Sequence, residues 1–490
     1  MIVAIVLCVY FLLLMVISRL AGRKGNDAFF RGNRQSPWLL VAFGMIGASL
    51  SGVTFISVPG MVLRSDMTYL QMCMGFFFGY LLVAFVLIPL YYNLRLTSIY
   101  GFLSKRFGER SHKTGAAFFL VSKLTGAAAR LYLVCLVLQT FLFSSIGIPY
   151  WGAALIVLGL IWLYTRRSGV RSIVWTDAFQ TLCMLVALAL ILAKVWTMLG
   201  MSGEEAFQAV VANPMSRVFE FDDWSAPSHF LKQFLSGIFI VVVMTGLDQD
   251  MMQKNLTCRS KRAAQKNLCL YGVLFLPVNF LFLALGVLLT LLYSKLGMPL
   301  PAGGDSLLPD LMATGTMGEI ALICFALGVV ASAFSSADSA ATALTTSFCI
   351  DILDMEHPGS APSPREERLR KRIHIAVLAL MGLFLLAFKA VGSSSVIDAI
   401  YMIAGYTYGP LLGLFAFGIL SRRQVIDKAV PYIALASPIL CFLLDIFTQN
   451  YYGYKFGYEL LLLNGLLTAA ALRVASREVV ALPAVTERES

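Results

Sequence analysis

The chain has 490 residues, of which 59% are hydrophobic and 13% are charged, and it carries a formal net charge of +11. Soluble domains contain about 25% charged residues, so this composition excludes an ordinary water-soluble fold and indicates a protein whose solvent is the lipid bilayer. The nine cysteines and four histidines are scattered, without a CxxC pair or a Cys/His cluster. They do not indicate a disulfide framework or a zinc site, and we expect no cofactor.

Apolar stretches long enough to cross a bilayer, about 20 residues each, recur from Ile2 to Arg473. The first stretch lacks a basic segment before it and a cleavage site after it, so we expect a retained helix and not a signal peptide. No soluble domain is expected. We predict thirteen transmembrane helices, at residues 2–20, 37–61, 68–93, 114–145, 148–165, 172–199, 229–253, 267–295, 317–352, 373–391, 394–420, 427–448 and 457–473.

The second and seventh of these helices are interrupted in the same way. Residues 47–60 read GASLSGVTFISVPG, and residues 244–254 read MTGLDQDMMQK. Backbone groups freed by a broken helix are tolerated inside a membrane only where they line a cavity or bind something. Because the two interruptions lie five helices apart, we expect helices two to six and seven to eleven to form inverted repeats.

Lysine and arginine gather in alternate connections, after the odd-numbered helices. Lys254, for example, is assigned to the connection after the seventh helix. The opposite connections hold only a few basic residues, such as Arg64, Arg217, Lys295 and Lys455. The positive-inside rule then places the N-terminus outside and the C-terminus in the cytoplasm of a cell-membrane protein. The net positive charge belongs to the inner membrane surface and does not indicate nucleic-acid binding.

A stripe of hydroxyl side chains runs along one face of the ninth helix, with Ser336 and Asp338 beside it. Its members are Ser332, Ser335, Ser339, Thr342 and Thr346. Small polar residues allow close helix packing, which is one interpretation. Hard cations such as Na⁺ prefer oxygen ligands, which is the other. Asp338 favours a cation site, because a carboxylate inside a span usually marks an ion or substrate pathway.

Three further aspartates each allow two interpretations. Asp177, about two turns inside the sixth helix, is either a snorkelling end charge or part of an ion pathway. Asp248 and Asp250, at the break of the seventh helix, either cap the freed backbone or contact the solute or a gate.

Arg130 lies more than ten residues from either end of the fourth helix, too deep to snorkel. It needs a negatively charged partner. One candidate is an internal carboxylate, Asp338 or Asp248, and the other is a solute carboxylate held by both guanidinium arms. We interpret Lys123, which lies nearer the cytoplasm, as an internal or snorkelling charge.

Seven segments in this order resemble the sodium:solute symporter family, which includes sodium/glucose, sodium/proline and sodium/sialic-acid transporters. They are FFRGNR, SGVTFISVPG, TSIYGFLSKRFG, GVRSIVWTDAFQ, GLDQDMMQKN, SAFSSADS and IAGYTYGPLLGLFAFGIL. The resemblance implies an all-α integral membrane protein with a LeuT-like core of five plus five inverted helices, one helix before it and two after it. The expected regions are 1–36 (extra helix and cytoplasmic loop), 37–200 (first repeat), 201–228 (external loop), 229–420 (second repeat), 421–473 (two accessory helices) and 474–490 (cytoplasmic tail).

The resemblance also implies ion sites. One Na⁺ would bind the hydroxyls of Ser335 and Ser336 and the backbone carbonyls of Gly47, Leu50 and Ser332. A possible second Na⁺ would use Asp177, Ser335, Asp338 and Ser339. Asp338 stands where a hydroxyl is expected, so the second site could be stronger, proton-linked or absent.

Candidate solute contacts at the two helix breaks are Ser51, Thr54, Gln71, Arg130, Asp248 and Gln249. Arg130 resembles the arginine with which sialic-acid relatives hold a carboxylate, and Asp248 stands where sugar-transporting relatives have an amide. Both favour an acidic or zwitterionic solute, such as a sialic acid or a monocarboxylate, over a neutral sugar or polyol.

We therefore expect a Na⁺-coupled symporter that imports a small solute by alternating access, with a monomer sufficient for function. A membrane-embedded enzyme is the rival class. It would need a DDxxD, HxxxD or HExxH motif, and the sequence contains none of the three.

Overall fold

The computed structural model describes residues 2–22, 26–166, 169–355, 364–391 and 396–478. Within these ranges the chain is helical apart from loops and one two-stranded antiparallel pair, β1 (Gln424–Val425) with β2 (Ser476–Arg477). Most of the predicted tail, residues 474–490, lies outside the described residues.

A helix or bent helix pair lies at each of the thirteen predicted spans in the described part of the chain, and up to eleven of them are long and apolar enough to cross a bilayer. Nine helices are long and apolar enough to span a bilayer, two more spans are bent helix pairs, and two are shorter apolar helices. The spans are α1 (Ile2–Ala21), α3 (Trp38–Ser49) with α4 (Gly52–Ser65), α5 (Tyr69–Leu82) with α6 (Ile88–Asn93), α8 (Glu109–Leu138), α9 (Tyr150–Thr165), α10 (Val170–Leu199), α12 (Phe230–Val241) with α13 (Gln249–Leu256), α14 (Lys261–Lys295), α16 (Gly318–Ser347), α17 (Pro364–Val391), α18 (Val396–Leu420), α19 (Val430–Tyr452) and α20 (Leu460–Val474).

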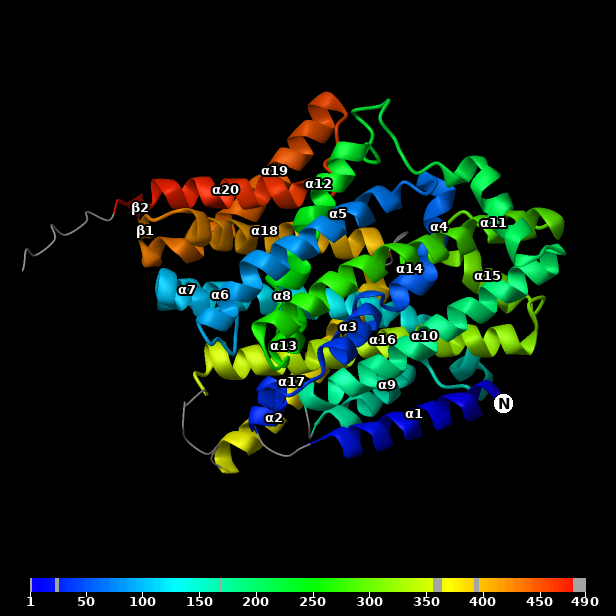
Figure 1. The fold of residues 1–490 in the computed structure, drawn as a ribbon, viewed down its shortest axis with the longest axis horizontal. Coiled ribbons are helices and arrows are strands. Elements are labelled where there is room, and N and C mark those ends of the chain that lie inside the picture. The colour runs from blue at the N-terminus through cyan, green and yellow to red at the C-terminus, as the bar shows by residue number, and fades with distance from the viewer. Residues whose placement is uncertain (1, 23–25, 167–168, 356–363, 392–395, 479–490) are drawn as a thin grey trace, which may run out of the picture.

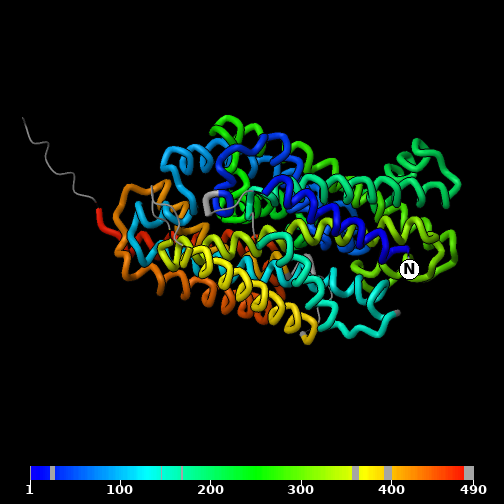
Figure 2. The backbone as a smooth tube through the Cα atoms, turned by 90° about the horizontal axis from the view of Figure 1, so that it is seen from below, coloured from blue at the N-terminus to red at the C-terminus, as the bar shows by residue number. Residues whose placement is uncertain are grey.

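Shorter helices lie in the connections. They are α2 (Asn26–Arg31), α7 (Gly101–Arg106), α11 (Gly203–Ala212) and α15 (Leu307–Ala313). The long helices run along one common direction, and the N-terminus and the last described residues lie at opposite ends of the molecule (Figures 1 and 2). This is the arrangement that an odd number of spans requires.

Both predicted interruptions are sharp bends. α3 meets α4 at 60°, and the helix that begins with α12 meets α13 at 64°. At the first bend, the Leu50 amide donates to the Ile46 carbonyl and the Thr54 amide donates to the Ser51 carbonyl. The carbonyls of Gly47 and Leu50 therefore lie between two hydrogen-bond ladders and belong to neither.

The helices next to the breaks pack closely. α3 lies against α10 and α16, and α13 lies against α16 and α3. Gly47 permits the approach of α3 to α10, because a Cβ atom there would clash with the Thr181 hydroxyl. Small residues at such contacts are the usual means by which membrane helices approach.

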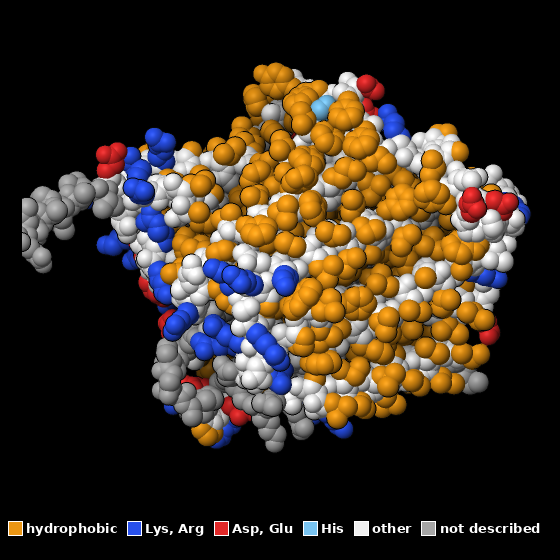
Figure 3. All heavy atoms as spheres, viewed as in Figure 1, with side chains coloured by type: hydrophobic (Ala, Val, Ile, Leu, Met, Phe, Trp, Pro, Cys, Tyr) orange, Lys and Arg blue, Asp and Glu red, His pale blue; other side chains and the backbone are white. Residues whose placement is uncertain are grey.

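The outer surface matches a membrane setting. Hydrophobic side chains cover the broad middle of the face in Figure 3, and lysines and arginines gather toward the end that carries β1 and β2. Many large apolar side chains of α1 and α19 are exposed, among them Leu12, Leu435 and Phe442. Because lipid and not water is the solvent for this belt, these exposed side chains incur no hydrophobic penalty.

Candidate functional site

A network of buried ion pairs lies at the second helix break. Lys123 Nζ of α8 is 2.7 Å from Asp250 Oδ2 and 3.1 Å from Asp248 Oδ2. Asp248 also accepts hydrogen bonds from the Tyr408 hydroxyl at 2.6 Å and from the Asp250 amide at 2.9 Å. Lys123 is therefore an internal charge, and Asp248 caps α13, as the local interpretation of that residue predicted.

Asp177 does not snorkel, because it is fully buried. Its Oδ2 lies 2.8 Å from Lys254 Nζ, and its Oδ1 accepts a 2.7 Å hydrogen bond from the Ser335 hydroxyl. Lys254 also lies 3.7 Å from Asp250 Oδ1. The aspartate of α10 is thus joined to α13 and to the hydroxyl stripe of α16.

The residues expected to hold Na⁺ fall in one neighbourhood. The Gly47 amide donates to the Thr181 hydroxyl at 3.1 Å, one turn of α10 from Asp177, which in turn contacts Ser335. The start of α4 packs on the same part of α16, since a Cβ atom on Gly52 would lie 3.2 Å from the Val329 carbonyl. α10 therefore connects the free carbonyls of the first break to the hydroxyls of α16.

Ser332 and Ser336 of α16 donate their hydroxyl protons to backbone carbonyls of their own helix. Ser332 donates to the Gly328 carbonyl at 2.7 Å, and Ser336 donates to the Ala333 carbonyl at 3.1 Å. A hydroxyl that donates its hydrogen still has oxygen lone pairs to offer. Both residues are buried, so a cation would compete with little water for these oxygens.

Asp338 is placed differently from the other carboxylates. It is fully buried, and neither carboxylate oxygen has a hydrogen-bond partner among the described residues. The Tyr164 hydroxyl of α9 is one of the polar groups near it. Ser339, its neighbour in sequence, donates instead to the Ser335 carbonyl at 2.8 Å and to Asp250 Oδ2 at 3.3 Å.

Two of the candidate solute contacts are held by other parts of the protein. Gln71 donates to the Ser228 carbonyl at 2.9 Å and accepts from the Glu220 amide at 3.1 Å, both in the external loop. Gln249 donates to the Thr97 carbonyl and accepts from the Ile99 amide, each at 3.0 Å. The side-chain amides of Gln71 and Gln249 therefore bond to backbone groups in this structure.

Arg130 has a different environment. It is half-buried on α8 and forms no ion pair with any carboxylate in the described ranges. Asp248, one of its two suggested internal partners, is occupied by Lys123 and Tyr408. Ser51 and Thr54 are buried at the break between α3 and α4.

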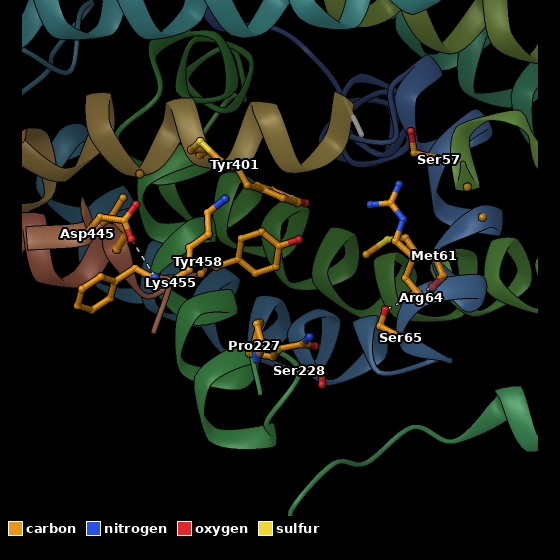
Figure 4. A pocket seen from close by; sticks show the side chains of 18 of the residues that line it. Ser57, Met61, Arg64, Ser65, Pro227, Ser228, Tyr401, Asp445, Lys455 and Tyr458 are labelled. Atoms are coloured by element: carbon orange, nitrogen blue, oxygen red, sulfur yellow. Dashed lines mark hydrogen bonds between the residues drawn. The ribbon is translucent and has the colours of Figure 1, made fainter. Parts of the chain in front are cut away.

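A cavity of about 470 Å³ opens beyond the first break. Ser57 of α4, one turn after Thr54, lines it, and so do Tyr401 of α18 and Tyr458. Arg64 and Lys455 reach into it from opposite sides (Figure 4). The Tyr401 hydroxyl lies 3.1 Å from that of Tyr69 on α5, so α18 and α5 meet beside this cavity. We call this cavity the vestibule.

A model of the sodium:solute symporter family matches residues 29–429. The chain belongs to the sodium:solute symporter family. Relatives of this symporter include the sodium/sialic acid symporter NanT of Aliivibrio fischeri, 25% identical over 96% of this chain and 93% of the relative. The human sodium/iodide cotransporter is also 25% identical, over 81% of this chain and 61% of the relative.

The solved structure of a Na⁺-coupled sialic acid symporter in a substrate-bound outward-open state has the same fold. It matches 98% of this chain with a TM-score of 0.81 at 22% identity, and 99% of that chain is covered. The predicted LeuT-like fold is therefore confirmed. The protein is a multi-pass membrane transporter that couples a solute to Na⁺, and it is not an enzyme.

The partners of the buried charged residues were not predicted from the sequence. Lys254 was counted among the basic residues of a cytoplasmic connection, whereas α13 continues to Leu256 and buries it at 2% exposure. The sequence did contain a signal for this ion pair, because Lys254 follows Asp250 by four residues and so shares its helix face. Tyr408 and Tyr164 gave no such signal.

Proposed function

We propose that this symporter imports an acidic organic solute of the sialic-acid or monocarboxylate class together with Na⁺. The observation that carries the proposal is Arg130, a guanidinium within a transmembrane helix that pairs with no described carboxylate. Such a group is costly in a membrane unless something negative binds it. A carboxylate fits its two parallel N–H groups.

The comparisons support an anionic solute. Relatives carry the names of transporters of sialic acid, iodide and monocarboxylates, which are all anions. The residues that we propose around the solute are Arg130, Ser51 and Thr54, with Asp248 fixing the break of the seventh span. We leave Gln71 and Gln249 out of the proposed pocket, because backbone groups engage both amides.

For Na⁺ we propose a site made of the Gly47, Leu50 and Ser332 carbonyls and the Ser335 and Ser336 hydroxyls. The support is that two of these carbonyls lie outside the helix ladders while the hydroxyls are buried and donate elsewhere. A second Na⁺ at Asp177, Asp338 and Ser339 would have to share Asp177 with Lys254.

In the proposed cycle, Na⁺ bridges α3 of the first repeat (37–200) to α16 of the second repeat (229–420) and stabilises an outward-open state. Solute then enters through the vestibule and completes the contact between the two breaks. Rocking of the repeats releases both into the cytoplasm. We propose a cell-membrane location with the N-terminus outside and a monomer as the working unit. The basic end of the surface supports this orientation.

The test is a thermal-shift panel on the purified symporter, with N-acetylneuraminate, pyruvate, proline and galactose in Na⁺ and in choline. A true ligand at about 100 times its Kd stabilises the protein by about 2.7 kcal/mol. We expect Na⁺-dependent stabilisation by an acid of the panel. Stabilisation by galactose alone would favour the neutral-sugar alternative and overturn the proposal.

A further inference from the structure

Lys254 lies beside Asp177, which is one of the residues expected to hold a possible second Na⁺. Its ammonium lies 2.8 Å from Asp177 Oδ2 and 3.7 Å from Asp250 Oδ1, and its side chain is 2% exposed. A buried charge of this kind is stable only while its partners remain paired with it. Since Lys254 is covalently part of α13, this positive charge is present in every cycle.

Three of the four residues expected to bind a second Na⁺, namely Asp177, Ser335 and Ser339, already have partners. Asp177 is paired with Lys254 and Ser335, and Ser339 donates to Asp250 and to a carbonyl of its own helix. Asp338 lies beside Tyr164 of α9. One of the two carboxylates of the expected second ion site therefore already has a cation 2.8 Å away.

We infer that the Lys254 ammonium takes the place of a second Na⁺ beside Asp177, so that this symporter binds one Na⁺ and not two. The side chain at position 254 then determines how many Na⁺ ions the symporter binds. A side chain without charge there would leave Asp177 with a free oxygen in a dry, oxygen-rich space. Such a space attracts a hard monovalent cation.

A consequence for transport rests on the proposed function. If the solute is a monoanion, one Na⁺ per solute moves no net charge. Uptake by the wild type should then be insensitive to membrane potential, whereas a second Na⁺ would add a driving force of about 2.3 kcal/mol per 100 mV.

The experiment counts Na⁺ without any solute. Radioactive Na⁺ binding to the purified symporter in lipid nanodiscs is titrated at constant ionic strength with choline. The variants are Lys254→Met, which removes the charge at similar length, and Lys254→Arg, which keeps it. Lys194→Met, at an exposed lysine of α10, is the matched control for loss of a lysine.

We expect one bound Na⁺ per chain in the wild type, in Lys254→Arg and in Lys194→Met, and two in Lys254→Met. The double variant Lys254→Met/Asp177→Asn should return to one, because the carboxylate that attracts the extra ion is gone. If Lys254→Met does not fold, this charge-neutral double variant and the wild-type count still test the inference.

Two Na⁺ in the wild type, or one in a folded Lys254→Met, would overturn the inference and leave Na⁺ coupling intact. Absence of Na⁺ binding by the wild type would instead overturn the proposed Na⁺ site. The two failures are therefore distinguishable.

Discussion

Replacement of Arg130 separates solute recognition from internal charge balance. Arg130→Lys keeps the positive charge but cannot hold a carboxylate through two parallel N–H groups. A hydrogen bond to a charged group contributes about 1.5–3 kcal/mol, so the loss of one should raise the solute Kd about 10-fold to 150-fold. Arg130→Ala should lose more.

The same substitutions should leave the solute-free protein nearly unchanged. Arg130 forms no ion pair with a described carboxylate, so neither variant leaves a buried negative charge without its partner. Melting temperature is measured against Na⁺ concentration in wild type and in both variants, first without solute and then with N-acetylneuraminate and pyruvate. The expected result is a normal Na⁺ response with a weakened response to the acid.

Two results would refute this reasoning. One is an Arg130→Lys variant that binds the acid as tightly as the wild type. The other is a loss of solute-free stability that Asp338→Asn or Asp248→Asn restores, because that pattern belongs to an internal ion pair.

Three further predictions follow from the same geometry. Ser336→Ala should weaken Na⁺ affinity roughly tenfold or more without unfolding the protein, and Ser335→Ala should do the same, because each removes one oxygen of a small site; unchanged Na⁺ activation of uptake in both variants would exclude this site. Lys123→Ala should lower stability by about 3–5 kcal/mol in chemical denaturation by leaving Asp248 and Asp250 short of a cation, with Lys123→Ala/Asp250→Asn recovering part of the loss, and a stable single variant would contradict the network. Gln71→Ala should lower the melting temperature, since two buried backbone groups of the external loop lose their partner, while the Kd for the acid changes less than twofold; a large rise in Kd would return Gln71 to the solute pocket.

The helices could be identified from the sequence because the pattern that indicates a helix is local. A run of about 20 apolar residues is sufficient to predict a span, and an interruption by glycine, serine or aspartate is visible within it. Both breaks were found in this way, and a helix or bent helix pair lies at each predicted span in the described part of the chain. The error at Lys254 was a boundary error of three residues, which was enough to assign a buried cation to a loop.

The pairing of the charged side chains could be determined only from the fold. The sequence places Arg130, Lys123, Asp177 and Asp248 at membrane depth, but it does not say which helix faces meet. Arg130 and Lys123 lie two turns apart on α8, and either was a reasonable partner for Asp248. The structure assigns Asp248 to Lys123, and that assignment leaves Arg130 available to a solute.

Several of the buried ion pairs and hydrogen bonds join the two predicted repeats. Lys123 of the fourth span pairs with Asp250 of the seventh, and Asp177 of the sixth span contacts Lys254 of the seventh and Ser335 of the ninth. The proposed Na⁺ adds a bond of the same kind, from the carbonyls of α3 to the hydroxyls of α16. In the proposed cycle, in which the two repeats rock against each other, contacts between the repeats change, whereas contacts within a repeat move with it. Na⁺ therefore acts on the equilibrium between states only through its different affinity for them, and the lysines set how much of the buried negative charge remains for it to neutralise.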